Sequence, residues 1–293
     1  MAAPNTRATL IGGGAILLWA LLALFTAASG QVPPLQLTAM SFAIAFTISV
    51  VVWLIRGQNP LRRVKAPVGA WALGVCGLFL YHAVYFLALR TAPVVDASLI
   101  AYTWPLLIVL FSAMLPGERL RWFHAVGALA GFAGAVLIVA ARGVEFSELS
   151  VGYFAAVTCA LLWSGYSVLN RRYADVPTDV VGGFCGATAV LALIGHLLFE
   201  TTIWPKGALQ WLAVLGLGLG PVGGAFFLWD HGTKHGDIRI LGAAAYLAPL
   251  LSTLILIAFG TAEPTVRILL ACILITGGAA LAAKEMLRPA RRT

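Results

Sequence analysis

Charged residues are scarce in this sequence. They make up 10% of the 293 residues, whereas a soluble domain carries about 25%. Hydrophobic residues reach 61% and the mean hydropathy is +0.95, which is too apolar for a single core surrounded by water. The sequence therefore predicts a protein whose solvent is the lipid bilayer, so lipid is a partner of the whole fold.

The residue patterns of enzymes and metal sites are also missing. The sequence has no HExxH, no P-loop, no dinucleotide fingerprint, and no evident carboxylate pair or Ser/His/Asp set. Its four cysteines lie in apolar segments without a CxxC spacing, which favours small buried residues over a metal site or a disulfide. We predict a protein that is not an enzyme and that binds no cofactor and no metal.

Acidic residues are few as well. The eleven carboxylates lie mainly in loops or at the ends of apolar segments, and none falls in the middle of one. We therefore expect no buried carboxylate. That expectation disfavours a sodium site, an acidic proton relay and the export of cations, because such sites use a carboxylate inside the membrane.

Ten apolar segments are long enough to cross a bilayer. They cover roughly residues 8–28, 36–55, 68–89, 95–115, 122–140, 150–170, 180–199, 208–229, 239–259 and 266–284. Backbone groups in lipid must be paired within their own segment or in a closed barrel, and these lengths suit helices. The predicted fold is an all-α membrane protein with ten transmembrane helices.

The net charge of +8 comes from basic residues clustered between the apolar segments. If the N-terminus is cytoplasmic, fifteen of the nineteen Lys and Arg residues fall on the cytoplasmic side. The other four are Arg90, Arg142, Lys206 and Arg267. This bias follows the positive-inside rule. We predict that both termini are cytoplasmic and that nucleic acid is not a partner.

The second half of the chain repeats features of the first half at a constant offset of 144 residues. The matching pairs are Trp19 and Trp163, Arg90 and Lys234, Tyr102 and Tyr246, and Pro105 and Pro249. Because five helices is an odd number, the second copy enters the membrane from the opposite side. We predict a single transmembrane domain made of two inverted five-helix repeats, residues 1–143 and 144–293.

Polar and aromatic residues inside the apolar segments are the candidate site. His82 is the one ionisable group well inside a predicted span, and Tyr85 shares its helical face, whereas Tyr81 is expected to point elsewhere. A tyrosine hydroxyl at this depth needs a partner and therefore faces the bundle or a wet cavity. We predict a central aromatic-lined cavity whose substrate-binding residues are Trp19, His82, Tyr85, Tyr102, Trp163, Tyr166 and Tyr246. The structural alternative for His82 is a neutral ring bonded between helices.

Glycine and proline mark places where helices bend or pack closely. Pro105 and Pro249 should kink two helices at equivalent positions. Gly220 and Pro221 belong to a run of helix breakers between residues 216 and 224, which indicates either close packing or a hinge. The GxxxG motif at Gly127 predicts that the helix over 122–140 packs tightly against a neighbour.

Several motifs resemble the drug/metabolite transporter superfamily, whose EamA-like members have ten helices. The first copy carries Ala88–Leu89, Ala97, Leu99 and Pro105, followed by Leu115–Leu120 (LPGERL). The second copy departs from the pattern at Asp230–His231. Within the superfamily, the chain is most similar to the bacterial aromatic amino acid exporters of the YddG type.

That resemblance implies a protein of the bacterial inner membrane that exports aromatic and related amino acids by alternating access. Two alternatives stay open: an exporter of a different amphipathic metabolite or drug, and a membrane scaffold without transport. The sequence leaves the oligomeric state open too. On the main hypothesis, Tyr102→Ala and Tyr246→Ala should each reduce transport without loss of folded protein.

Overall fold

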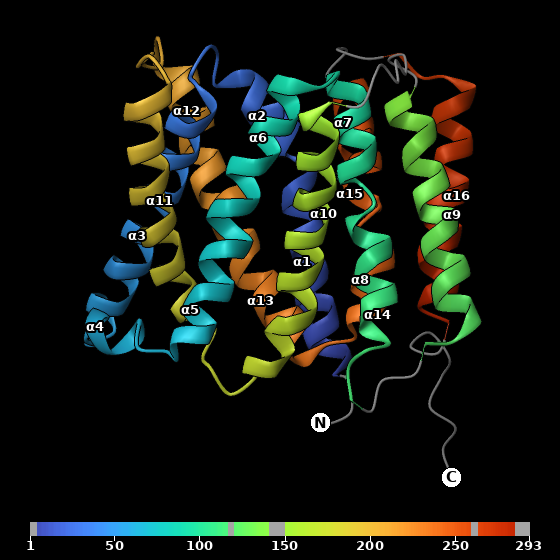
Figure 1. Ribbon diagram of the computed structural model, residues 1–293, viewed down its shortest axis with the longest axis horizontal. Coiled ribbons are helices and arrows are strands. Elements are labelled where there is room, and N and C mark those ends of the chain that lie inside the picture. Colours follow the sequence, from blue (N-terminus) through green and yellow to red (C-terminus); the bar gives the residue numbers. More distant parts are fainter. Residues whose placement is uncertain (1–4, 117–119, 141–149, 259–262, 285–293) are drawn as a thin grey trace.

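The structure is a computed structural model that describes residues 5–116, 120–140, 150–258 and 263–284. The helices stand side by side in one bundle (Figure 1), and the described residues contain no strand, so the all-α prediction is confirmed. Eight described helical segments are long and apolar enough to cross a membrane, and two apolar helices, Asp96–Ser112 and Val266–Ala282, are shorter. The number of spans therefore stays a prediction.

The elements of the first half are α1 (Thr6–Ala20), α2 (Leu22–Ala28), α3 (Pro34–Ile55), α4 (Pro60–Arg63), α5 (Val68–Val75), η1 (Cys76–Leu80), α6 (Tyr81–Thr91), α7 (Val94–Ala101), α8 (Trp104–Ser112) and α9 (Trp122–Val139). Those of the second half are α10 (Val151–Leu169), η3 (Asn170–Tyr173), α11 (Val180–Phe199), α12 (Ala208–Leu219), η4 (Gly220–Gly224), α13 (Ala225–His235), α14 (Ile238–Ala244), α15 (Leu247–Ala258) and α16 (Val266–Ala282). Three features predicted from the sequence lie outside the described residues. They are the boundary between the repeats at residue 143, the residue Arg142, and the Gly117–Arg119 part of the family motif.

The two halves of the chain run in opposite directions through the bundle. In Figure 1, α1 starts at the lower end and α10 starts at the upper end. The chain leaves α16 at the lower end, on the side where α1 began. The described connections between the long helices lie at the two ends of the bundle, which form its upper and lower rims.

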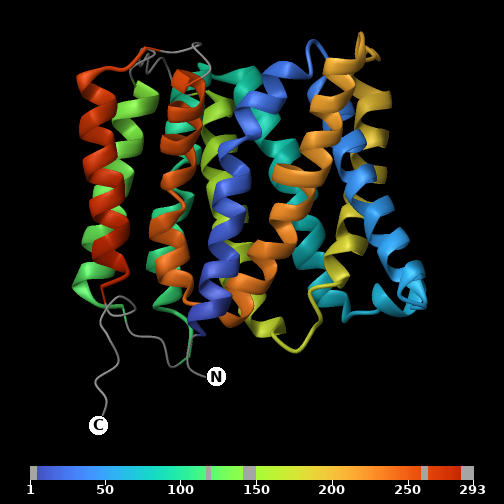
Figure 2. The ribbon, with the colours of Figure 1, turned by 180° about the vertical axis from the view of Figure 1, so that it is seen from behind.

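The packing partners of the two halves are exchanged. Helix α1 packs against α13, while α10, which follows α1 by the repeat offset, packs against α6. In two other packed pairs, α3 with α11 and α9 with α16, the second helix corresponds to the first at the repeat offset. Helix α10 crosses the middle of Figure 1, and α1 crosses the middle of the reverse view in Figure 2. The halves therefore meet along the centre of the bundle.

Two kinds of helix irregularity recur at the repeat offset. The breaks between α7 and α8 and between α14 and α15 come just before Pro105 and Pro249, which confirms the predicted bends. Short π-helical turns form at Cys76–Leu80 and Gly220–Gly224, again 144 residues apart. A π-helical turn interrupts the i→i+4 ladder and often marks a functional region. The glycine run therefore forms the second π-helical turn, and it is closely packed, since a Cβ atom added to Gly218 would lie 2.6 Å from the Cβ atom of Ile44 on α3. A hinge at this turn stays a prediction.

The GxxxG motif packs as predicted. A Cβ atom added to Gly127 would lie 2.5 Å from the carbonyl oxygen of Gly278, and one added to Gly278 would lie 2.5 Å from the carbonyl oxygen of Gly127. The backbones of α9 and α16 therefore touch, which is how small residues drive helix association in lipid.

This contact predicts that alanine substitutions at two neighbouring glycines have different effects on the melting temperature. Gly278→Ala should lower the melting temperature of the purified protein, because the added methyl group overlaps a backbone oxygen and overpacking costs about 1–3 kcal/mol. Gly277→Ala is the matched control, since no atom lies within 4 Å of its added Cβ. Equal melting temperatures in the two variants would show that α9 and α16 are not in close contact.

Candidate functional site

Four tryptophan rings from four helices fill the centre of the bundle. The ring centroid of Trp19 on α1 lies 5.7 Å from that of Trp163 on α10 and 5.0 Å from that of Trp229 on α13. The ring of Trp104, at the start of α8, is 6.1 Å from those of Trp163 and Trp229. Most of these pairs are edge-to-face, a favourable geometry for aromatic rings. The predicted pair Trp19 and Trp163 is thus brought together between the two halves.

Helix α6 extends this aromatic centre with polar side chains. The ring centroid of Tyr81 lies 5.2 Å from that of Trp163, and Tyr81 stacks on Tyr85 at 6.2 Å. The Tyr85 hydroxyl is 3.5 Å from the Ser98 hydroxyl on α7. The expectation that Tyr81 points elsewhere is wrong: it lies between the tryptophans and Tyr85.

His82 has a defined tautomer in this arrangement. Its Nδ1 atom lies 2.5 Å from the carbonyl oxygen of Leu78 in the π-helical turn η1. A carbonyl oxygen accepts only, so Nδ1 must donate, and Nε2 of the neutral ring is then an acceptor. The ring packs edge-on against Phe42 at 5.5 Å and against Phe226 at 6.2 Å.

The second π-helical turn is also bonded by a ring nitrogen, but from the other half of the chain. The indole N–H of Trp19 donates to the carbonyl oxygen of Pro221 at 3.1 Å. The residue that follows His82 by the repeat offset is Phe226, which has no polar atom in its ring. Trp19 therefore donates to a carbonyl of η4 as His82 donates to one of η1, although the counterpart of Leu78 is Val222 and not Pro221. This contact ties the predicted hinge residues Gly220 and Pro221 to the aromatic centre.

The two repeat-related tyrosines have different surroundings. Tyr102 lies half-buried at the break before α8, close enough to Tyr81 for their hydroxyls to interact electrostatically. Tyr246 is fully buried at the break before α15 and accepts a hydrogen bond of 3.2 Å from the backbone N–H of Leu106. Its ring lies 6.2 Å from Phe132 on α9, outside the aromatic centre. The structure therefore groups Tyr102 with the candidate site and Tyr246 with the packing of α8.

The candidate site is more accessible at its upper side than at its lower side. Tyr81, His82 and Tyr85 are half-buried, whereas Tyr166 is 2% exposed and Trp229 is fully buried. The ring centroid of Tyr166 lies 5.3 Å from that of Trp163, as predicted from their spacing. The buried Tyr166 hydroxyl has no hydrogen-bond partner among the described residues. It is therefore a polar group that a bound solute could satisfy.

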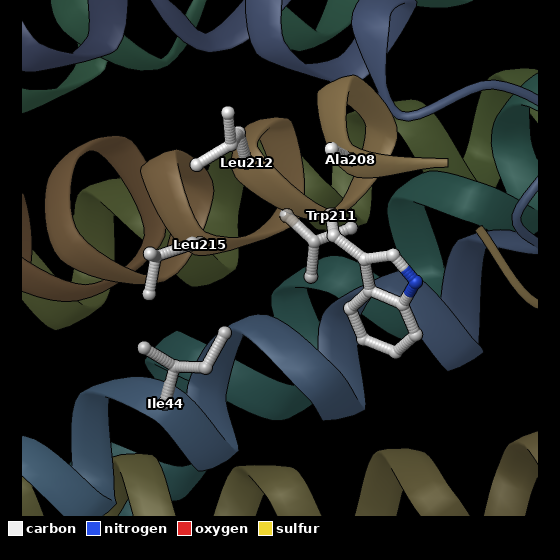
Figure 3. Close-up of a pocket in the computed structure, with 6 residues that line it drawn as sticks. Ile44, Ala208, Trp211, Leu212 and Leu215 are labelled. Atoms are coloured by element: carbon white, nitrogen blue, oxygen red, sulfur yellow. The ribbon is translucent and has the colours of Figure 1, made fainter. Parts of the chain in front are cut away.

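Two grooves lie elsewhere, along the seam between α3 and α12. The larger, about 450 Å³ in volume, is an apolar groove in which Ile44 faces Trp211 and Leu215 (Figure 3). The smaller, about 250 Å³, lies lower on the same seam. Neither groove is lined by a predicted substrate-binding residue. The rings of the aromatic centre pack closely together, since Trp163 is 3% and Trp104 is 8% exposed, and its upper edge is half-buried.

A buried ion pair lies below the aromatic centre. The carboxylate of Asp230 lies 2.9 Å from the ammonium of Lys234, and both side chains are almost fully buried. Asn170 and Thr178 also donate hydrogen bonds to this carboxylate, at 3.0 and 2.7 Å. The Lys234 ammonium also donates to the carbonyl oxygen of Val176 at 3.0 Å. The network joins the end of α13 to the segment that follows α10.

The expectation of no buried carboxylate is therefore wrong. Asp96 is also fully buried and accepts a hydrogen bond of 3.1 Å from the Tyr153 hydroxyl. Glu200 is buried at the upper rim, where it pairs with Arg90 at 3.1 Å and accepts from the backbone N–H of Leu35. These carboxylates lie near the ends of helices, where partners from neighbouring elements satisfy them.

Four residues of the aromatic centre were not among the predicted substrate-binding residues: Tyr81, Trp104, Phe226 and Trp229. Phe226 and Trp229 follow predicted site residues at the repeat offset, since Phe226 corresponds to His82 and Trp229 to Tyr85. The offset of 144 residues was therefore a sufficient signal to find them. Tyr81 carried no such signal, because its counterpart is Ala225.

The ion pair predicts strong coupling between two substitutions. Lys234→Met or Asp230→Leu alone should destabilise the protein by about 3–5 kcal/mol, because each leaves one buried charge unpaired. The double variant should lose much less than the sum of the two single losses. Thermal unfolding of the purified variants tests this expectation. Additive losses would mean that the two charges do not interact.

Comparison with known proteins identifies the family. The model of the EamA-like transporter family matches residues 7–140 and 150–283. The chain is 53% identical over 281 residues to the aromatic amino acid exporter YddG of Ancylobacter novellus, which covers 95% of this chain and 97% of that relative. It is 24% identical over 265 residues to the aromatic amino acid exporter YddG of Escherichia coli strain K12, covering 84% and 86% of the two chains.

A solved crystal structure superimposes on this chain with a TM-score of 0.90 at 52% sequence identity, covering 96% of this chain and 99% of the other. The family matches fall once in each half of the sequence, as a repeated architecture requires. The resemblance inferred from the sequence motifs is thereby confirmed. This multi-pass membrane protein belongs to the EamA-like transporter family.

Proposed function

We propose that this protein exports aromatic amino acids and closely related metabolites. The observation that carries the proposal is the identity of 53% over 95% of the chain to a relative named as an aromatic amino acid exporter. The aromatic centre supports it independently. The half-buried ring of Tyr81, which lies against Trp163, offers a stacking surface to an aromatic side chain. Such a surface suits an aromatic solute better than a small polar one.

The polar groups of the site suit a solute without net charge. Along its half-buried upper edge they are the His82 imidazole and the hydroxyls of Tyr85, Ser98 and Tyr102. Each of these groups is uncharged in its ordinary form, and a zwitterion offers both donors and acceptors to such groups. The Asp230 carboxylate is neutralised by Lys234, so it offers no free charge to a cation. An amino acid zwitterion fits this set better than a quaternary cation does.

We further propose ten spans in two inverted repeats, with both termini on the cytoplasmic side of the bacterial inner membrane. The helices Asp96–Ser112 and Val266–Ala282 complete the set of ten, and their length is at the short end of the range of about 17–25 residues for a span. The opposite directions of α1 and α10 and their exchanged partners support inversion. The basic residues that favour a cytoplasmic lower rim include Arg62 and Arg63 on α4.

Alternating access would proceed by rocking of the two halves around the aromatic centre. The upper edge of the site is half-exposed, whereas Trp229, Asn170 and Asp230 are buried below it. This gradient supports assignment of the structure to an outward-facing state, closed at the cytoplasmic side by the Asp230–Lys234 network. The π-helical turns η1 and η4 are the proposed flexible points, because each interrupts a helix that lines the centre.

Flux through proteoliposomes tests the proposed function. Vesicles containing the purified protein should take up labelled phenylalanine and tryptophan faster than vesicles without it, and much faster than they take up labelled lysine or glutamate. An imposed pH gradient should change the rate only if proton movement is coupled to transport. Absence of flux for every aromatic amino acid would refute the proposal.

The two tyrosines provide a site-specific test. Tyr102→Ala should reduce aromatic amino acid flux by about tenfold or more with little change in melting temperature, because Tyr102 is half-buried at the site. Tyr246→Phe should instead lower the melting temperature, since losing the acceptor of the buried Leu106 N–H costs about 1–3 kcal/mol. Unchanged flux in correctly folded Tyr102→Ala would place the substrate elsewhere.

A further inference from the structure

The smaller groove on the α3–α12 seam is a narrow slot that opens toward lipid. Its apolar walls include Ile48 and Val52 of α3 and Leu219 at the end of α12. Ile48 is 36% and Leu219 53% exposed, so the slot opens on the outer surface of the bundle. Its inner wall is formed by Gly218, Gly223 and Gly224. Without side chains there, the slot reaches the backbone of the π-helical turn η4.

The dimensions of the slot match one lipid chain in one leaflet. Its residues on α3 extend from Ala45 to Arg56. At about 1.5 Å per residue, this helical length is about 16 Å, or half of the roughly 30 Å hydrocarbon core. The cavity volume of about 250 Å³ is smaller than a typical small-molecule pocket of about 300–1,000 Å³. A long, thin, apolar occupant is therefore favoured.

The lower rim of the slot carries positive charge. Arg56 caps the end of α3 and lines the slot, and its side chain is exposed. Asp179 lines the same rim, but it pairs with Arg63 at 3.1 Å, which neutralises its charge. Arg62 on α4 and Lys65 just after it are two further exposed cations at the lower end of the bundle, in the segment that follows α3. Such clusters at the end of a membrane helix favour anionic lipid headgroups.

We propose that this slot binds one anionic phospholipid, with an acyl chain along α3 and η4 and its phosphate at Arg56. The assignment of this lipid to the inner leaflet rests on the proposed cytoplasmic position of the lower rim. The proposed binding site does not depend on that orientation. The chain would lie on the outer side of η4, while the Pro221 carbonyl of the same turn accepts its hydrogen bond from Trp19 on the inner side. The lipid and the transport site thus contact opposite sides of one turn.

Native mass spectrometry of the purified full chain tests this proposal without a transport assay. The protein is mixed with phosphatidylglycerol and phosphatidylcholine that carry identical acyl chains. We expect one tightly retained phosphatidylglycerol molecule per chain. Arg56→Gln should weaken its retention about fivefold, the equivalent of about 1 kcal/mol for one cation near an anionic lipid. Arg172→Gln is the matched control, because Arg172 is an exposed arginine away from the slot.

A second pair of variants tests the chain-binding part of the slot. Ile48→Trp should fill the slot and abolish retention of the lipid, whereas Ile55→Trp adds the same ring to α3 outside the slot and should leave it unchanged. Equal retention of the two phospholipids, or undiminished retention in both Arg56→Gln and Ile48→Trp, would overturn the proposal. Because binding is read directly, its failure is distinguishable from a failure to transport amino acids.

Discussion

The contact between Trp19 and Trp163 is the interaction on which the rest of the bundle depends. In lipid, helices gain no hydrophobic free energy by associating, so close packing and interhelical hydrogen bonds must hold them together. These two rings meet at 5.7 Å where the halves of the chain cross, and Trp19 also donates a hydrogen bond to the carbonyl of Pro221. A single side chain thus joins the centre of one half to the π-helical turn of the other.

The backbone of the two halves is nearly symmetric, but the side chains at the centre are not. The π-helical turns and the helix breaks recur at the same offset. At the centre, however, His82 faces its counterpart Phe226, and Tyr85 is matched by Trp229. The side of His82 and Tyr85 is therefore polar and half-buried, while the side of Phe226 and Trp229 is aromatic and buried. Such a division suits an asymmetric solute with an apolar body and a polar end, while the symmetric backbone allows two equivalent states.

The fold was largely predictable from the sequence because its signals are local and periodic. Apolar length predicted helices, the prolines predicted the breaks near Tyr102 and Tyr246, and the GxxxG motif predicted the contact between α9 and α16. The orientation of Tyr81 was predictable as well, but the expectation compared Tyr81 only with its neighbour His82. Tyr81 and Tyr85 are four residues apart in the regular helix α6, so they share a face and stack.

The buried carboxylates escaped prediction for a different reason. Asp230 was judged by its position near the end of an apolar segment, where a charge can reach water. In the folded chain its partners come from Lys234, one turn later, and from Asn170 and Thr178, which are more than fifty residues earlier in the sequence. The pair at positions i and i+4 was visible in the sequence. The two remote partners, which make its burial possible, depend on tertiary structure.

The central claim is that an aromatic amino acid binds between the two halves at this centre. A structure of the protein determined with bound tryptophan tests it most directly. The account predicts the indole of the ligand against Tyr81 and Trp163, with its amino and carboxylate groups toward His82, Tyr85 and Tyr102. Tryptophan bound only in the seam between α3 and α12, with the aromatic centre unchanged, would contradict it.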